Sequence, residues 1–125
     1  MPENEPATAA LVVADTAGKI IAFDAGAEEF FGHPAGEALG GSLDVIVPAD
    51  LQEAHWQGFN AAIRTSHAEL EGNPINLPVH CHDGKVRIFP GVFRLLRDPH
   101  GNALGAVATY SPAVEAGPFT PVPAG

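Results

Sequence analysis

PINLPVHCHDGKVRIFPGVFRLLRDPHGNALGAVATY, residues 74–110, contains three runs of strand-forming residues separated by two turns. The strands are expected at 74–80, 86–97 and 103–110. The Asp83-Gly84 pair and the DPHGN sequence at 98–102 are typical of tight turns, so the three strands are expected to pair antiparallel. Pro90-Gly91, inside the middle strand, predicts a bulge or a local break in pairing.

The longest helical pattern, at about 49–65, precedes these strands. Within LQEAHWQGFNAAI (51–63), the i, i+3, i+4 spacing places one set of residues on a single helix face: Leu51, Ala54, His55, Gly58, Phe59, Ala62 and Ile63. His55 lies near the centre of this apolar face, where an unpaired polar group is costly. The pattern therefore calls for a partner, which could be a side chain, a backbone carbonyl or a metal.

The N-terminal part of the sequence supplies the remaining strands and helices from which the fold class is predicted. ALVVAD (10–15) and IIAFD (20–24) form a predicted hairpin, and short helical pieces are expected at 25–32, 35–40 and 43–47. Two strands, a run of helices and three further strands indicate an α+β domain, with helices on one face of an antiparallel sheet.

Composition limits the classes of function. The chain has 125 residues, 46% of them hydrophobic, which suits one domain, expected at 9–111 between tails at 1–8 and 112–125. A net charge of −9 with six Lys and Arg opposes binding to nucleic acid or to an anionic membrane surface. No apolar run has membrane-spanning length, and the acidic N-terminus does not resemble a secretory signal, so a cytoplasmic location is expected.

Five short motifs, in order along the chain, resemble those of the PAS domain family. They are DTAGKIIAF (15–23), FFGHPAGEALG (30–40), VPADL (47–51), HDGK (82–85) and DPHGNALGAVA (98–108). The resemblance implies a five-stranded antiparallel sheet in the order 2-1-5-4-3, with short helices and one long helix enclosing a pocket. PAS domains are sensors and interaction modules, and the content of the pocket sets the class.

The resemblance extends most closely to the heme-binding members. HWQGFNAAIRTSH (55–67) is similar to their long-helix sequence and places the axial iron ligand on His55, with heme b as cofactor. Flavin photochemistry is not expected, because the single cysteine, Cys81, lies in HCHDG at a strand end. The distal arginine of oxygen sensors aligns with Ile75, so an apolar distal wall would favour carbon monoxide or nitric oxide over oxygen. The expected cofactor-binding residues are Leu51, His55, Gly58, Phe59, Ala62, Ile75, Leu77, Val92 and Phe93.

The sequence therefore predicts a heme-binding sensor of a diatomic gas or of redox state, with output through a signalling partner protein or a homodimer. A PAS module without heme, binding another ligand or a protein, is the first alternative. A heme enzyme of the peroxidase type is the second, weakened by the lack of a clearly placed distal acid–base pair. His80 and His82 are expected at an ordinary hairpin end rather than at a metal, and His33, His67 and His100 are expected in solvated turns.

Overall fold

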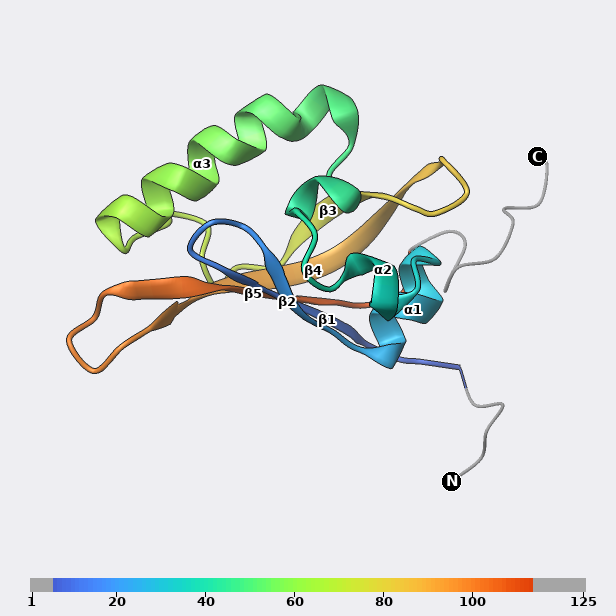
Figure 1. Ribbon diagram of the computed structural model, residues 1–125, viewed down its shortest axis with the longest axis horizontal. Coiled ribbons are helices and arrows are strands. Elements are labelled where there is room, and N and C mark those ends of the chain that lie inside the picture. The colour runs from blue at the N-terminus through green and yellow to red at the C-terminus, as the bar shows by residue number, and fades with distance from the viewer. Residues whose placement is uncertain (1–5, 114–125) are drawn as a thin grey trace.

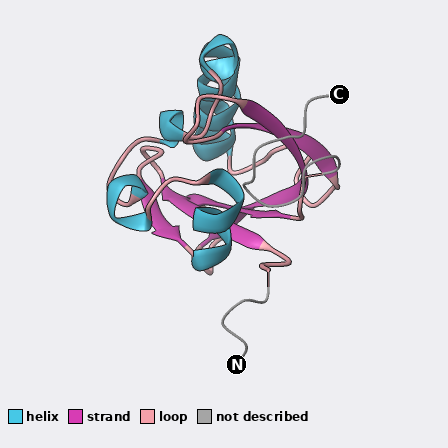
Figure 2. Cartoon of the chain, turned by 90° about the vertical axis from the view of Figure 1, so that its right-hand side faces the viewer, coloured by secondary structure: helices cyan, strands magenta, loops and turns pink. Residues whose placement is uncertain are grey.

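The computed structural model describes residues 6–113, which form a five-stranded antiparallel sheet with helices on one side (Figures 1 and 2). The strands are β1 (Ala10–Asp15), β2 (Ile20–Phe23), β3 (Ile75–His80), β4 (Val86–Arg97) and β5 (Ala103–Tyr110). The helices are α1 (Ala25–Phe31), α2 (Ala35–Ala38) and α3 (Gln52–Thr65), with the 3₁₀ turns η1 (Leu43–Val45) and η2 (Ala49–Leu51). The strand order is β2-β1-β5-β4-β3, which confirms the expected fold class and topology.

Capping residues on either side of α1 determine where the helix begins and ends. The side chain of Asp24 accepts a hydrogen bond from the Ala27 backbone N–H at 2.8 Å, which satisfies one of the unpaired donors at the helix start. Gly32 ends the helix in the left-handed conformation, at φ 81°, and its N–H donates to the Glu28 carbonyl. α1 is thereby held at a fixed position over the sheet.

The predicted interruption at Pro90-Gly91 is wrong, because β4 runs through both residues with regular pairing. Pro90 pairs with Asn76, and Gly91 pairs with Ile75 on one side and Tyr110 on the other. The Gly91–Tyr110 pair is the last on the β5 side, so the missing N–H of Pro90 falls where that ladder ends. The irregularity in β4 instead lies between Leu96 and Arg97.

Aromatic side chains fill the end of the domain beneath α1. The Phe31 ring lies 5.0 Å from Phe89 and 4.9 Å from Tyr110, in edge-to-face contacts, and Phe30 stacks on Phe89 at 5.6 Å. Phe30, Phe31 and Phe89 have no exposed surface. We call this aromatic cluster and the small residues packed around it, such as Ala27 and Ala38, the packed half.

Residues on both sides of the expected domain, 9–111, contact the core. The backbone N–H of Ala7 donates to Glu29 at 2.9 Å, and Ala7 packs on the core, as does Ala113. The expected tails otherwise fall largely on residues 1–5 and 114–125, which lie outside the described residues. Within 6–113, no helix combines the length and the apolar character needed to span a membrane.

Candidate ligand pocket

A cavity of about 600 Å³ separates α3 from the inner face of the sheet. Figure 1 shows α3 as a long helix raised above the strands, and the structure places only Ala62 of this helix among its buried residues. The cavity wall combines the inward residues of α3, of η1 and η2, and of four strands. Those from the sheet include Val12, Ala14, Ile75, Leu77, Val79, Phe93, Leu95, Ala106, Ala108 and Tyr110. We call this cavity and its wall the hollow half.

Most of the expected cofactor-binding residues lie around this one cavity. The lining includes Leu51, His55, Gly58, Phe59, Ala62, Ile75, Leu77 and Phe93. Val92 does not line it, because successive strand residues point to opposite faces and Phe93 takes the inward position. Val92 lies instead against a smaller hollow of about 310 Å³, lined also by Pro90 and Thr109.

The helix stripe is narrower than its periodicity predicts. Ala54 is exposed and, like Ile63, does not line the cavity. Gly58 does, and a Cβ added to it would meet nothing within 4 Å, so this part of the helix borders open space. Of the predicted stripe, the residues that line the cavity are therefore Leu51, His55, Gly58, Phe59 and Ala62.

His55 is the polar side chain of this helix face. It is half-buried, and its ring lies 5.0 Å from Trp56 and 5.9 Å from Phe59. Its Nδ1 atom is buried and has no hydrogen-bond partner in the described structure. Burial lowers the pKa of His55, and the nearby Asp44 carboxylate opposes this shift. The imidazole is therefore a neutral polar group in an apolar wall.

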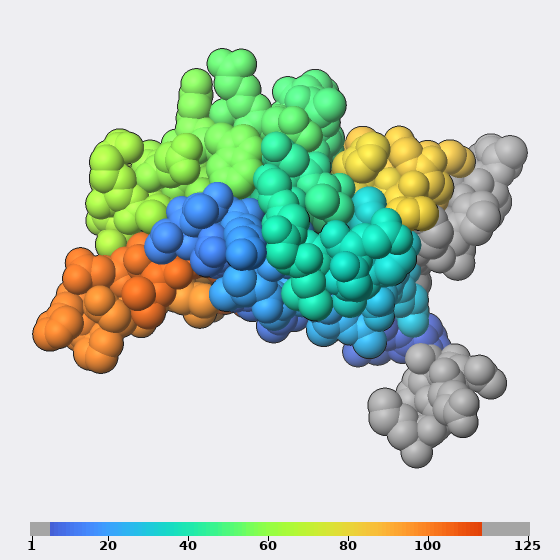
Figure 3. Space-filling model, viewed as in Figure 1, coloured from blue at the N-terminus to red at the C-terminus, as the bar shows by residue number. Residues whose placement is uncertain are grey.

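Trp56 fastens the start of α3 to the rest of the domain. Its indole N–H donates to the Asp44 carboxylate at 2.7 Å, and its ring covers Gly18 in the β1–β2 turn. A Cβ at Gly18 would stand 2.1 Å from the Trp56 ring, so this contact requires glycine. Figure 3 shows α3 (green) resting against the β1–β2 turn (blue). Trp56 thus has a packing role at the start of α3 and is not part of the cavity lining.

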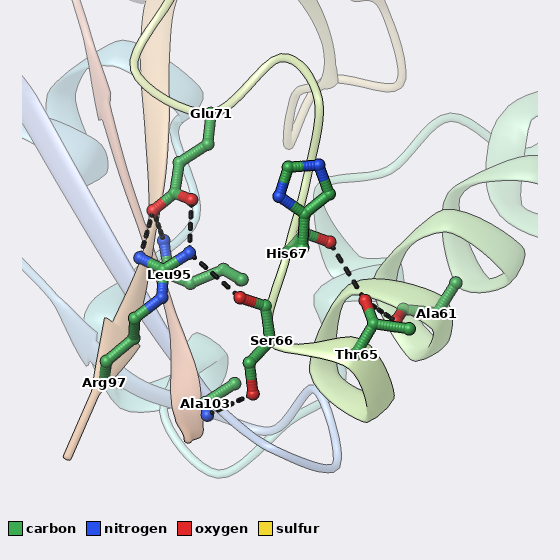
Figure 4. A network of polar contacts seen from close by, with 8 residues as sticks. All are labelled: Ala61, Thr65, Ser66, His67, Glu71, Leu95, Arg97 and Ala103. Carbon is green, nitrogen blue, oxygen red and sulfur yellow. Dashed lines mark hydrogen bonds and ion pairs between the residues drawn. The ribbon is translucent and has the colours of Figure 1, made fainter. Parts of the chain in front are cut away.

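A short segment, residues 66–72, closes the cavity beyond the end of α3, and we call it the strap (Figure 4). Both ends of the strap are attached to the sheet. At its start, Ser66 Oγ accepts from the Ala103 N–H at 2.8 Å, and at its end Glu71 accepts from the Leu95 N–H at 2.7 Å. Arg97 joins the two ends, since it pairs with Glu71 at 2.6 Å and donates to the Ser66 carbonyl.

The middle of the strap lines the cavity with His67, Ala68, Glu69 and Leu70. No local sequence signal marks the strap as part of the site, because its position depends on the contact of Glu71 with Arg97, 26 residues further along the chain. Glu71 is held as a carboxylate, since the hydrogen bonds from Arg97 lower its pKa to about 2.

A second group of histidines, His33, His80 and His82, lies outside the cavity lining. His33 is buried, and its Nε2 lies 3.0 Å from the His80 carbonyl, so the expectation of a solvated His33 is wrong. The ring of His82 lies 5.4 Å from that of His33. The backbone of the β3–β4 turn explains the burial, because the His82 N–H donates to the Phe31 carbonyl and closes the turn over α1. Within residues 6–113, no three His, Cys, Asp or Glu side chains are arranged to hold a metal ion.

No family model matches the sequence. An uncharacterized protein of Azorhizobium caulinodans is 32% identical over 78 residues, which are 62% of this chain and 11% of that protein. The chain therefore matches only a small part of this relative.

Solved structures with the same arrangement of elements are more informative. A PAS domain from Colwellia psychrerythraea superposes with a TM-score of 0.68 at 18% identity, covering 82% of this chain and 83% of that one. The PAS domain of the Cronobacter turicensis quorum-sensing receptor RpfR, in complex with C12:0, gives 0.66 at 16% identity, covering 86% and 96%. A light-oxygen-voltage domain studied with a flavin analogue gives 0.61 at 17% identity, covering 84% and 76%. The chain therefore has the PAS fold.

Proposed function

We propose that this chain is the ligand-binding module of a sensor, and that its ligand occupies the cavity between α3 and the sheet. The observation that carries the proposal is the cavity itself, about 600 Å³ with a mostly apolar wall. Pockets for small organic ligands measure about 300–1,000 Å³ and combine an apolar lining with a few polar groups. A hollow of this size costs packing energy that a bound ligand would recover.

Two structures with the same fold are described with an organic ligand, which agrees with the proposal. One of these proteins is described with C12:0 and the other with a flavin analogue. At 16% and 17% identity they share the fold with this chain, so they support a ligand-binding role without identifying the ligand.

Heme is the second candidate, and the neutral imidazole of His55 favours it. A neutral imidazole in an apolar wall is a suitable iron ligand. Two features fit heme less well. Nδ1 of His55 has no carbonyl or carboxylate partner to orient the ring, as a metal-bound histidine normally has. The charged side chain in the lining is Glu69, which would not pair with the two propionates of heme. If heme binds, it would supply an iron centre for a diatomic ligand or an electron.

Native mass spectrometry of the purified protein tests the proposal. We expect an adduct of one small organic molecule per chain, released by organic solvent. Ala106→Trp, which fills the cavity from β5, should abolish the adduct while the protein stays folded by circular dichroism. An adduct that survives in the filled variant would place the ligand elsewhere and overturn the proposal.

Adding hemin separates the two candidates. If the ligand is another organic molecule, the Soret band of hemin added to the protein should match that of free hemin. This should hold for the wild type and for His55→Ala. A sharp Soret band that is lost in His55→Ala would establish the heme candidate in its place.

The output of such a module is proposed to pass through a partner protein or a second copy of the chain. The residues described here form one sensor-type domain and contain the cavity as their candidate input site.

A further inference from the structure

The wall of the cavity limits the charge of the ligand, an inference that rests on the proposed function. Its polar side chains are His55, His67, Glu69 and Tyr110. Arg87 and Arg97 are paired with Asp83 and Glu71, and neither arginine is part of the lining. The fixed charge that the wall presents is therefore the negative one of Glu69. A buried anion needs a paired cation, so carboxylate and phosphate ligands are poorly matched to this wall.

His55 limits the polar group of the ligand in a second way. Its ring lines the cavity between Trp56 and Phe59, and its Nδ1 lacks a partner. In the neutral ring one nitrogen donates and the other accepts. A hydroxyl group both donates and accepts, so it pairs with the imidazole in either tautomer. A carboxylate only accepts and also brings a charge.

The rest of the wall determines the bulk of the ligand. The strands contribute aliphatic and aromatic side chains, such as Leu77 and Phe93, and α3 contributes Leu51 and Phe59. A cation is poorly matched as well, because Glu69 is exposed to solvent and would compensate little of the lost hydration of a buried ammonium group. We propose that the cavity selects an uncharged, largely apolar molecule that carries a hydroxyl group, with that hydroxyl paired to the imidazole of His55.

A series of ten-carbon probes with different head groups tests this selection. Affinities of 1-decanol, decanoate and decylamine are measured at pH 8 by isothermal titration calorimetry, below the concentrations at which the probes aggregate. At this pH the carboxylate is charged and His55 is neutral. We expect 1-decanol to bind about tenfold or more tightly than decanoate, because the charged head loses its hydration without gaining a cation.

Two variants identify the group that recognises the hydroxyl. His55→Phe keeps a ring of similar size and removes both nitrogens, and it should weaken 1-decanol about fivefold, as expected for one neutral hydrogen bond. Phe93→Leu, on the sheet side of the cavity, changes the apolar wall alone. It should therefore alter 1-decanol and decanoate by the same factor.

The outcomes separate this inference from the proposed function. Decanoate or decylamine binding as tightly as 1-decanol, or an unchanged preference for 1-decanol in His55→Phe, would overturn the head-group selection and leave the cavity as a ligand site. Absence of binding by all three probes, together with no adduct in native mass spectrometry, would overturn both.

Discussion

The two halves of the inner sheet face are built from similar residues and differ in how they are filled. In the packed half, α1 lies directly on the strands, and Phe30, Phe31 and Phe89 are fully buried. In the hollow half, α3 is twice as long, and yet only Ala62 of this helix is buried and a cavity of about 600 Å³ lies beneath it. Protein interiors are normally close-packed, and this hollow is the observation on which the proposed ligand-binding function rests.

The two halves also differ in how their helices and loops are held against the sheet. α1 is held by its own buried side chains, whereas the elements around the cavity are held at their edges. Trp56 ties α3 to Asp44 and Gly18, and Glu71 ties the strap to Arg97. The hollow half is thus stabilised by contacts around the edge of the cavity, whereas the packed half is stabilised by buried side chains.

Truncating an aromatic side chain should give the largest difference in the free energy of unfolding between the two halves. Phe89→Ala removes a fully buried ring and should lower the free energy of unfolding by about 3–5 kcal/mol. Phe93→Ala, on the same strand and facing the cavity, should cost less than about 2 kcal/mol, because its ring is half-buried. Urea unfolding measures both. Equal losses would mean that the cavity does not distinguish the two halves.

Enlarging an alanine is the converse experiment, and alanine and leucine have similar helix propensities. Ala27→Leu on α1 has no space for the added carbons and should cost about 1–3 kcal/mol. Ala62→Leu on α3 extends into the cavity, so the free energy of unfolding should change by less than about 1 kcal/mol or increase. A severe loss in Ala62→Leu would show that the space beneath α3 is filled.

Each half also contains one histidine whose pKa burial lowers, His33 and His55. Because the unfolded state then takes up protons more readily, stability should be highest above the ordinary pKa of about 6.5 and should fall as the pH drops below it. Unfolding at pH 8 and pH 5.5 measures this difference. His55→Phe and His33→Gln should each reduce it, the former with little loss of stability at pH 8.

If the free energy of unfolding depends on pH in both variants as it does in the wild type, groups other than His33 and His55 cause that dependence. His80 and His82 are the first to examine, since both face His33. Glu37 also acts on His33, in the opposite sense, and Asp44 does so on His55.

The sequence predicted the elements well, because local signals define them. The Asp24 cap, the left-handed Gly32 and the turn at Asp83-Gly84 all operate within a few residues. The sheet order followed from resemblance to the PAS family and not from local patterns. The placement of Phe89 and Tyr110 in one cluster depends on the pairing of β4 with β5.

The errors share a physical cause, since each depends on contacts distant in sequence. Pro90 is tolerated because β5 ends beside it, and His33 is buried because the His82 turn closes over α1. Val92 and Phe93 are both apolar, and only the register shows which of them faces the cavity. The strap was missed because an ion pair between Glu71 and Arg97 defines it.

A methyl-resolved nuclear magnetic resonance titration tests the central claim most directly, namely that the hollow half is a ligand site. With 1-decanol as the probe, we predict the largest shift changes at methyl groups of the cavity wall, such as Leu51, Ile75 and Leu77. Ile20, buried outside the lining, and Ile88 and Leu104, exposed outside it, should change little. Changes centred on Ile88 and Leu104, or no saturable change in the wall, would contradict the account.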